Sequence, residues 1–374
     1  MRSASESRSM VGRVVASVAG TARLTATGTG AAAREVLMAG PKAGRTAEGR
    51  TFLITGGASL IGSHLADQLL DRGAAEVRLL ENFALGSPDT IAHLLEDRRV
   101  RLIRGDITRL NELLDASKGV DGLFALAGFL TLPMSQNPAL GVQINALGVV
   151  NTLEAARHAG VGRVVFSSST AAYGNAQAEA LDEDVGFVSA GLGPASMVYS
   201  SSKLLGEALC GLYAKTYGLE TNVLRFASVY GERQHGRAVN ANYIAQLYET
   251  VRTGRPPEIP GDGSEVHDYI HVTDVAAALF AAYTSEAHGL TLNISTDVDT
   301  TLTELVGHVL EAMGRPDLAP VYRDDTRAVR SYTATRLRFA NRRAAETIGW
   351  TPKVSVRAGV KRFVTWLDGQ QGAA

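Results

Sequence analysis

The chain has a single cysteine, Cys210, among its 374 residues. One cysteine excludes an intramolecular disulfide and fits a reducing compartment. Long apolar runs are also missing, since none reaches the roughly 18 residues that a membrane-spanning helix needs. No charge of one sign is in excess, because the net charge is −1, so there is no basic field for nucleic acid. These absences favour a soluble, cytoplasmic protein that binds small molecules and neither a membrane nor a nucleic acid.

Residues 1–48 differ in composition from the rest of the chain. They are rich in Ala, Arg, Gly, Ser and Thr, poor in acids, and without sustained hydrophobic periodicity. We expect a disordered leader. Organelle transit peptides have a similar composition, so a targeting signal is the alternative, but no amphipathic arginine face supports it.

From Arg50 onward, short apolar runs alternate with helical patterns. This alternation predicts an α/β fold with a doubly wound, Rossmann-like parallel sheet covered by helices on both sides. The predicted strands are 51–55, 77–80, 100–104, 122–126, 163–167 and 220–225, and the predicted helices are about 61–72, 87–96, 138–159 and 197–217.

After Gly231 the pattern breaks into shorter pieces, including a Pro/Gly-rich stretch at 255–263. We interpret this half as a smaller mixed α/β C-terminal lobe that holds the substrate. The predicted NAD-binding domain is 49–235, with 266–285 returning to it, and the predicted substrate-binding lobe is 236–265 together with 286–374.

A glycine-rich turn, Gly56 to Gly62, follows the first predicted strand and opens a helix. In that context, backbone N–H groups and the helix N-terminus hold a pyrophosphate. Ser59 replaces the middle glycine of the usual turn, which adds a side chain where the backbone approaches the ligand. Glu81, at the end of the second strand, can accept hydrogen bonds from ribose hydroxyls and would repel a 2′-phosphate, which favours NAD over NADP. A solvated strand-end glutamate is the alternative.

A tyrosine and a lysine four residues apart, Tyr199 and Lys203, lie downstream of that turn. On a helix they share one face, so the ammonium can lie beside the phenol and lower its pKa. A phenol with a lowered pKa can take a proton from a substrate hydroxyl near neutral pH. The pair therefore indicates a redox enzyme.

Together these motifs resemble those of an extended short-chain dehydrogenase/reductase, of the NAD-dependent sugar epimerase/dehydratase family. The resemblance covers about residues 50–368. The motifs that carry it are Thr55-Gly56-Gly57, Gly105-Asp106-Ile107, Leu126-Ala127-Gly128, Asn145, Ser167-Ser168-Ser169, Tyr173-Gly174, Tyr199 with Lys203, Arg225 with Val229-Tyr230-Gly231, and Asp268-Tyr269-Ile270-His271-Val272.

The resemblance implies a role for each matching residue. Ser169 would hydrogen-bond the substrate oxygen that Tyr199 deprotonates, and Lys203 would also bond the nicotinamide ribose. The implied catalytic residues are Ser169, Tyr199 and Lys203; the implied NAD-binding residues are Gly56, Ser59, Leu60, Ile61, Gly62, Glu81, Asn82, Asp106, Ile107, Ala127, Gly128, Asn145, Tyr199 and Lys203; and the implied substrate-binding residues are Ser169, Ser228, Asn240, His267 and Arg330. A plain strand-end turn is the alternative for the three serines.

The two residues after Ser169 help to choose the reaction. Sugar 4,6-dehydratases of the family have Asp and then Glu there as acid and base, whereas this chain has Thr170 and Ala171. The resemblance therefore implies an epimerase of a nucleotide-diphosphate sugar, with a 4-epimerase as the leading prediction. A dehydrogenase that makes a net oxidation of a sugar or other secondary alcohol is the main alternative, followed by a sugar dehydratase and a non-catalytic NAD-binding protein.

Two positions depart from the family pattern. Ser228 stands where many nucleotide-sugar epimerases have Asn, and His267 stands where an Arg usually grips the diphosphate. Histidine is only partly charged near pH 7, while Arg330 matches a second diphosphate-binding Arg. His267 and His271 are four apart, but the strand-like run between them argues against a metal pair.

The resemblance also implies a homodimer. Its interface would be formed by the predicted helices at about 141–158 and 197–217, which in the family make a four-helix contact.

Overall fold

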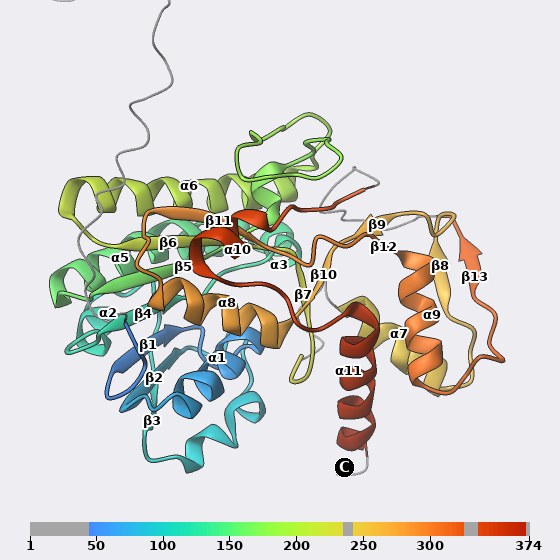
Figure 1. Cartoon of the computed structure of the whole chain (residues 1–374), viewed down its shortest axis with the longest axis horizontal. Coiled ribbons are helices and arrows are strands. Elements are labelled where there is room, and N and C mark those ends of the chain that lie inside the picture. The colour runs from blue at the N-terminus through green and yellow to red at the C-terminus, as the bar shows by residue number, and fades with distance from the viewer. Residues whose placement is uncertain (1–44, 235–241, 325–335, 372–374) are drawn as a thin grey trace, which may run out of the picture. The chain divides into compact units, whose positions relative to one another are not determined.

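The computed structural model of the chain describes residues 45–234, 242–324 and 336–371 (Figure 1). Residues 1–44 of the expected leader lie outside these ranges. The last part of that segment belongs to the fold, because Ala47 is buried in the core and Arg45 Nη1 lies 2.8 Å from Glu220 Oε2. The fold therefore already includes residues 45–48, which the prediction assigned to the leader.

A seven-stranded parallel sheet forms the centre of the part of the chain described here (Figure 1). Its strand order is β11-β6-β5-β4-β1-β2-β3. From β1 the sheet grows through β2 and β3 toward one edge, and from β4 it grows toward the other edge, so the direction reverses at the boundary between β1 and β4. The carboxyl ends of the strands leave a crevice at such a boundary. The strands are β1 (Thr51–Thr55), β2 (Glu76–Glu81), β3 (Val100–Arg104), β4 (Gly122–Ala125), β5 (Arg163–Ser169), β6 (Thr221–Phe226) and β11 (Leu290–Ile294). The doubly wound, Rossmann-like prediction is confirmed.

Helices cover both faces of the sheet because alternate strand residues point to opposite sides. Phe52 and Ile54 pack in one apolar cluster, and Leu53 between them packs in another. The first cluster includes residues of α1 (Leu60–Asp71) and α8 (Val272–Thr284), and the second includes residues of α2 (Leu110–Ala116), α5 (Gly148–Ala159) and α6 (Pro194–Tyr217). Figure 1 shows the two helix layers with the sheet between them.

The predicted boundary of the smaller lobe is wrong in one respect. The strand β11 pairs in parallel with β6 at the edge of the large sheet, although the prediction placed all of 286–374 in the lobe. The segment around α10 (Arg342–Ile348) also packs with the large core, where Trp350 Nε1 donates to the Asp274 carbonyl at 3.0 Å. The strand β11 thus forms an edge of the large sheet, and the segment around α10 belongs to the core on one of its faces.

The smaller lobe has its own apolar core and is mixed in structure, as predicted. That core contains residues of three helices and of several short strands. The elements of this half are β7 (Ser228–Tyr230), α7 (Asn242–Arg252), β8 (Glu258–Pro260), β9 (Val266–His267), β10 (Tyr269–His271), β12 (Thr300–Thr301), α9 (Leu302–Ala312), β13 (Val321–Arg323) and α11 (Val356–Gln371).

Two predicted helices differ from the structure. The segment 87–96 forms only two short 3-10 turns, η1 (Pro88–Ile91) and η2 (Leu94–Glu96), and the Ser87 side chain caps the first of them. The predicted helix 138–159 is α4 (Pro138–Val142) and α5 joined by a π-helical turn, η3 (Gln143–Leu147). In the described ranges, no helix is long and apolar enough to cross a membrane.

Candidate active site

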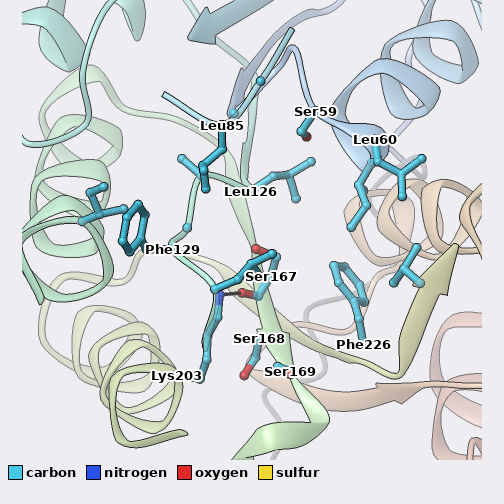
Figure 2. Close-up of a pocket in the computed structure, with 18 of the residues that line it drawn as sticks. Ser59, Leu60, Leu85, Leu126, Phe129, Ser167, Ser168, Ser169, Lys203 and Phe226 are labelled. Atoms are coloured by element: carbon cyan, nitrogen blue, oxygen red, sulfur yellow. Dashed lines mark hydrogen bonds between the residues drawn. The ribbon is translucent and has the colours of Figure 1, made fainter. Parts of the chain in front are cut away.

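A cavity of about 360 Å³ lies at the carboxyl ends of the central strands. Its wall follows the sheet from the loops after β3 and β2, past the turn after β1, to the ends of β4, β5 and β6. Figure 2 shows this wall, with Ser59 at the start of α1, Ser167 to Ser169 on β5, and Lys203 reaching in from α6. The predicted site residues that line the cavity are Gly56, Ser59, Leu60, Ile61, Glu81, Asn82, Asp106, Ile107, Ala127, Gly128, Ser169, Tyr199, Lys203 and Ser228.

The N-terminus of α1 opens onto the cavity at Ser59. This residue has an extended backbone, and its Oγ accepts a hydrogen bond from the Gly62 N–H at 3.1 Å, so it serves as the N-cap. The hydroxyl that replaces the usual glycine is therefore used to satisfy the helix end. The first turn also places the positive end of the helix dipole beside the cavity, which suits a pyrophosphate.

Two glycines of the turn have no room for a side chain. A Cβ on Gly57 would lie 2.6 Å from Leu79 Cβ, and one on Gly62 would lie 2.6 Å from the Gly56 carbonyl oxygen. Gly56 itself has φ of +72°, a conformation that favours glycine. The sequence thus allows α1 to sit directly against β1 and β2, which forms the tight cradle that a dinucleotide needs.

Glu81 is buried at the end of β2 rather than solvated. Its carboxylate accepts hydrogen bonds from the backbone N–H groups of Ala58 (3.2 Å), Asn82 (3.1 Å) and Phe83 (2.9 Å). Burial raises the pKa of Glu81, and these three bonds partly offset the rise. The carboxylate therefore fastens the glycine-rich turn to β2, and its contact with a ribose stays a prediction.

At the neighbouring position, the Asn82 side-chain amide donates to Asp106 Oδ2 at 3.1 Å. The Asp106 carboxylate also accepts two bonds from Thr108, and it lies beside Ile107 at the end of the cavity over β3. The amide and carboxylate groups at this end, next to the apolar Ile107 side chain, suit an adenosine. Together with the glycine-rich turn at the start of α1, these hydrogen-bonding groups fit a dinucleotide such as NAD.

The predicted catalytic residues meet over β5. The Ser169 hydroxyl hydrogen-bonds Tyr199 and accepts a bond from the Ala171 N–H at 3.1 Å. Lys203 Nζ donates to the Ser167 carbonyl at 2.9 Å, as Figure 2 shows, and lies 5.9 Å from the Tyr199 ring centroid. The structure therefore brings together the three side chains that the sequence analysis grouped.

The protonation of this group differs from the prediction. Burial raises the pKa of the Tyr199 phenol, and the bond to Ser169 only partly opposes this, so the expected lowering by Lys203 is wrong here. The reason is that the ammonium is bonded to a carbonyl of β5 instead of the phenol. Burial also lowers the pKa of Lys203 to about 8, with the Glu207 charge opposing it. Lys203 is still mostly protonated at pH 7.

Three predicted residues are placed away from the cavity wall. Gly62 lies behind the turn, and Asn145 is buried in the π-helical turn, where it bonds the backbone of Phe129 and the Ser202 hydroxyl. His267 does not line the cavity either; its Nε2 lies 2.7 Å from Glu265 Oε1. The structure thus supports a shaping role for Asn145 and gives His267 a carboxylate neighbour, while the contact of His267 with a substrate stays a prediction. Asn240 and Arg330 lie outside the described residues.

The sequence analysis did not single out Arg233, which lines the same cavity. It follows Gly231 and Glu232, has a φ of +66°, and forms an ion pair with Asp67 of α1. A left-handed backbone is uncommon for arginine, and nothing in the local sequence signals it. Leu85 and Phe129, both labelled in Figure 2, are further wall residues that apolar patterning alone could not assign.

Metal-binding chemistry finds no support in the described ranges, where no group of three or more His, Cys, Asp and Glu side chains is placed to hold an ion.

Comparison with known proteins agrees with a site that binds a dinucleotide. The model of the NAD-dependent epimerase/dehydratase family matches residues 52–295. The UDP-glucose 4-epimerase of Mycolicibacterium smegmatis is 33% identical over 321 residues, which are 84% of this chain and 97% of that protein.

Two solved structures are also similar. The UDP-glucose 4-epimerase of Thermotoga maritima, solved with UDP-glucose, has a TM-score of 0.76 and 28% identity, and the match covers 86% of this chain and 99% of that one. The UDP-glucose 4-epimerase of Thermus thermophilus, solved with NAD, has a TM-score of 0.74 and 30% identity, and the match covers 85% and 99% of the two chains.

Proposed function

The chain belongs to the NAD-dependent epimerase/dehydratase family as an NAD-dependent sugar epimerase, and from that premise we propose that it inverts C4 of a nucleotide-diphosphate sugar. The observation that carries the proposal is the contact between Ser169 and Tyr199, with Lys203 close by on the same cavity wall. The names of the relatives support a uridine diphosphate sugar as substrate. Thr170 and Ala171 also line the cavity and offer no carboxylate for elimination of water.

When bound, NAD supplies a reversible acceptor for the hydrogen that leaves the carbinol carbon with its electron pair. Tyr199 takes the hydroxyl proton, and Ser169 holds the same oxygen in place by a hydrogen bond. The product of this half-reaction is a ketone. In the reverse half-reaction Tyr199 returns the proton to the oxygen, while the carbon regains its hydrogen on the opposite face, so atoms and electrons balance over the cycle.

Lys203 contributes a positive charge near the phenol. A phenolate next to an ammonium is favoured over an isolated one, and this matters because burial alone raises the pKa of Tyr199. If Lys203 gave up its hydrogen bond to the Ser167 carbonyl, its ammonium would be free to interact with the Tyr199 phenol and to bond a ribose hydroxyl. The site therefore contains a base, a hydrogen-bond donor and a cation, which together with bound NAD as the hydride acceptor would allow alcohol oxidation and its reversal.

The test uses the full-length enzyme with catalytic NAD and a panel of UDP-, dTDP-, GDP- and CDP-sugars, followed by proton NMR in D2O. We expect a new C4 stereoisomer without net NADH absorbance and with hydrogen retained at the inverted carbon. Stoichiometric NADH with a ketone or acid product would make the enzyme a dehydrogenase. No product from any sugar would overturn the proposal.

We further propose that the chain forms a homodimer through α5 and α6. Leu205 and Leu212 are two helical turns apart on one face of α6 and are 44% and 54% exposed, and Leu147, the last residue of η3 just before α5, is 48% exposed. Apolar side chains at this spacing on neighbouring helices suit a helical interface.

A double variant, Leu205→Arg with Leu212→Arg, should sediment as a monomer, because two charges would be buried in the dimer. Leu95→Arg changes a leucine that is similarly exposed on another part of the molecule, and it should leave the dimer intact. Sedimentation velocity at micromolar concentration gives the answer. A wild-type monomer, or an intact dimer in the double variant, would rule out this interface.

A further inference from the structure

We propose that Glu207 is a positioning residue that places a negative charge one helical turn from Lys203 and, through Ser168 and Arg225, fixes the turn that carries Ser169. This inference rests on the proposed function for its kinetic consequence. Glu207 lies on α6 one helical turn after Lys203, on the same face. It does not line the cavity, so it would act through its neighbours.

Both oxygens of the Glu207 carboxylate accept hydrogen bonds from buried or nearly buried groups. Its Oε1 accepts a hydrogen bond from the Ser168 hydroxyl at 2.5 Å and one from Arg225 Nε at 2.9 Å, while Oε2 accepts from Arg225 Nη2 at 2.7 Å. The side chains of Arg225 and Glu207 are only 9% and 10% exposed. Charge-assisted, two-point contacts of this kind fix both groups in orientation.

The same network reaches the other end of the Ser169 turn. Ser169 caps η4 (Thr170–Tyr173), and the Arg225 guanidinium lies 4.8 Å above the ring centroid of Tyr173, the last residue of that turn. The Tyr173 hydroxyl donates to Asn293 Oδ1 of β11 at 2.7 Å. Ser168 and Tyr173 bracket Ser169, so one carboxylate and its arginine hold both sides of the catalytic serine.

Glu207 is also the carboxylate that acts on Lys203. The groups around the ammonium are the Tyr199 ring from its own helix and, from β5, the Ser167 carbonyl and the Phe166 ring, whose centroid is 5.4 Å away. The Glu207 charge acts on the ammonium from the next turn of α6. Burial lowers the pKa of Lys203 to about 8, and the Glu207 charge opposes that fall. Without this charge, burial and the unpaired Arg225 cation would both favour neutral Lys203.

A second ion pair, with a buried arginine and a partly exposed carboxylate, provides a control. Glu220 Oε2 lies 2.7 Å from Arg163 Nη2, and the Arg163 side chain is fully buried. This pair joins the start of β5 to the residue before β6, at the end of the sheet opposite to the cavity. Loss of either carboxylate leaves a buried arginine without its partner, but only one of the two is close to Lys203.

The primary experiment measures the protonation of Lys203 directly. Competitive acetylation of the intact protein between pH 6 and 10, with peptide mass spectrometry, gives the pH midpoint at which Lys203 becomes reactive. In Glu207→Gln we expect the midpoint to fall by about one pH unit. In Glu220→Gln and in Ser168→Ala, which keeps the carboxylate, it should stay at the wild-type value.

The kinetic readout should follow the labelling. In Glu207→Gln the basic limb of the kcat profile should move to lower pH by the same amount. Relative to the wild type, the loss of kcat at pH 8 should then be roughly four-fold larger than the loss at pH 6.5. Ser168→Ala should lower kcat at every pH without moving the limb. Glu220→Gln should lower the free energy of unfolding and leave the profile unchanged.

An unchanged Lys203 midpoint in Glu207→Gln would overturn the inference, and so would an equal shift in Glu220→Gln. If Glu207→Gln does not fold, the double variant Glu207→Gln with Arg225→Met removes the unpaired cation as well, and its midpoint should still fall below the wild-type value, by less than in the single variant. Failure of the proposed function is distinguishable, because the wild-type enzyme would then turn over no sugar while its Lys203 midpoint could still be compared with that of the variants.

Discussion

Tyr199→Phe should lower kcat for epimerisation about 10³-fold and leave the fold and NAD affinity close to those of the wild type. The substitution removes one oxygen, the atom that exchanges a proton with the substrate. Ser169 can still hydrogen-bond the substrate oxygen, but it has no cation beside it to favour its ionised form. Lys203 keeps its bond to the Ser167 carbonyl, so the local structure has no reason to change.

Tyr213→Phe is the matched control for this variant. Tyr213 is on the same helix and is also buried, and its hydroxyl donates to Glu154 at 2.7 Å, away from the cavity wall. Its removal should cost about 1 kcal/mol of unfolding free energy and little activity. Initial rates, NAD binding by fluorescence and urea unfolding would be measured for both variants. Activity of Tyr199→Phe within ten-fold of the wild type would exclude Tyr199 as the base.

The sheet, the glycine-rich turn and the Tyr199 and Lys203 pair could be predicted because they depend on local patterns, whereas most other residues of the cavity wall were implied by the family resemblance. Buried parallel strands are short apolar runs, and glycine positions such as Gly57 and Gly62 have steric reasons that hold wherever a helix starts so close to a strand. The Tyr199 and Lys203 pair follows from helical spacing alone. These features need no knowledge of what packs against them.

Other features depend on tertiary contacts and could not be predicted. Asn145 lies in a π-helical turn because its amide is bonded to Phe129 and Ser202, and residues far apart in sequence determine that contact. The strand β11 is only five residues long, so its sheet partner is set by the free edge of β6 rather than by its own pattern. The left-handed backbone of Arg233 is similarly fixed by its ion pair with α1.

The protonation state of the site was the least predictable property. Spacing places Lys203 beside Tyr199, but the direction of a pKa shift depends on the balance between burial and charge. Here burial raises the pKa of Tyr199 and lowers that of Lys203, and the compensating carboxylate, Glu207, lies outside the cavity. A sequence motif identifies the side chains of such a site, but it does not show how burial and charge together set their pKa values.

The second large effect is expected from Gly62→Ala, at the start of α1. A Cβ there would lie 2.6 Å from the Gly56 carbonyl oxygen and 2.8 Å from the Gly57 carbonyl oxygen. Both obstacles are backbone atoms, so no side-chain rotation can relieve the clash. The turn must move away from the helix, and overpacking of this kind costs about 1–3 kcal/mol of unfolding free energy.

The same movement should weaken NAD binding, because the turn and the first amides of α1 together hold the pyrophosphate. We expect the Kd for NAD to rise by roughly ten-fold or more, which corresponds to about 1.4 kcal/mol. Gly307→Ala is the control: Gly307 lies within α9, and a Cβ added there would meet nothing within 4 Å, so alanine should stabilise that helix by up to about 1 kcal/mol. Calorimetric titration of NAD and urea unfolding would be compared for the two variants. Wild-type NAD affinity in a stable Gly62→Ala protein would mean that the cofactor is held chiefly by the ribose and nicotinamide ends of the cavity rather than by the turn.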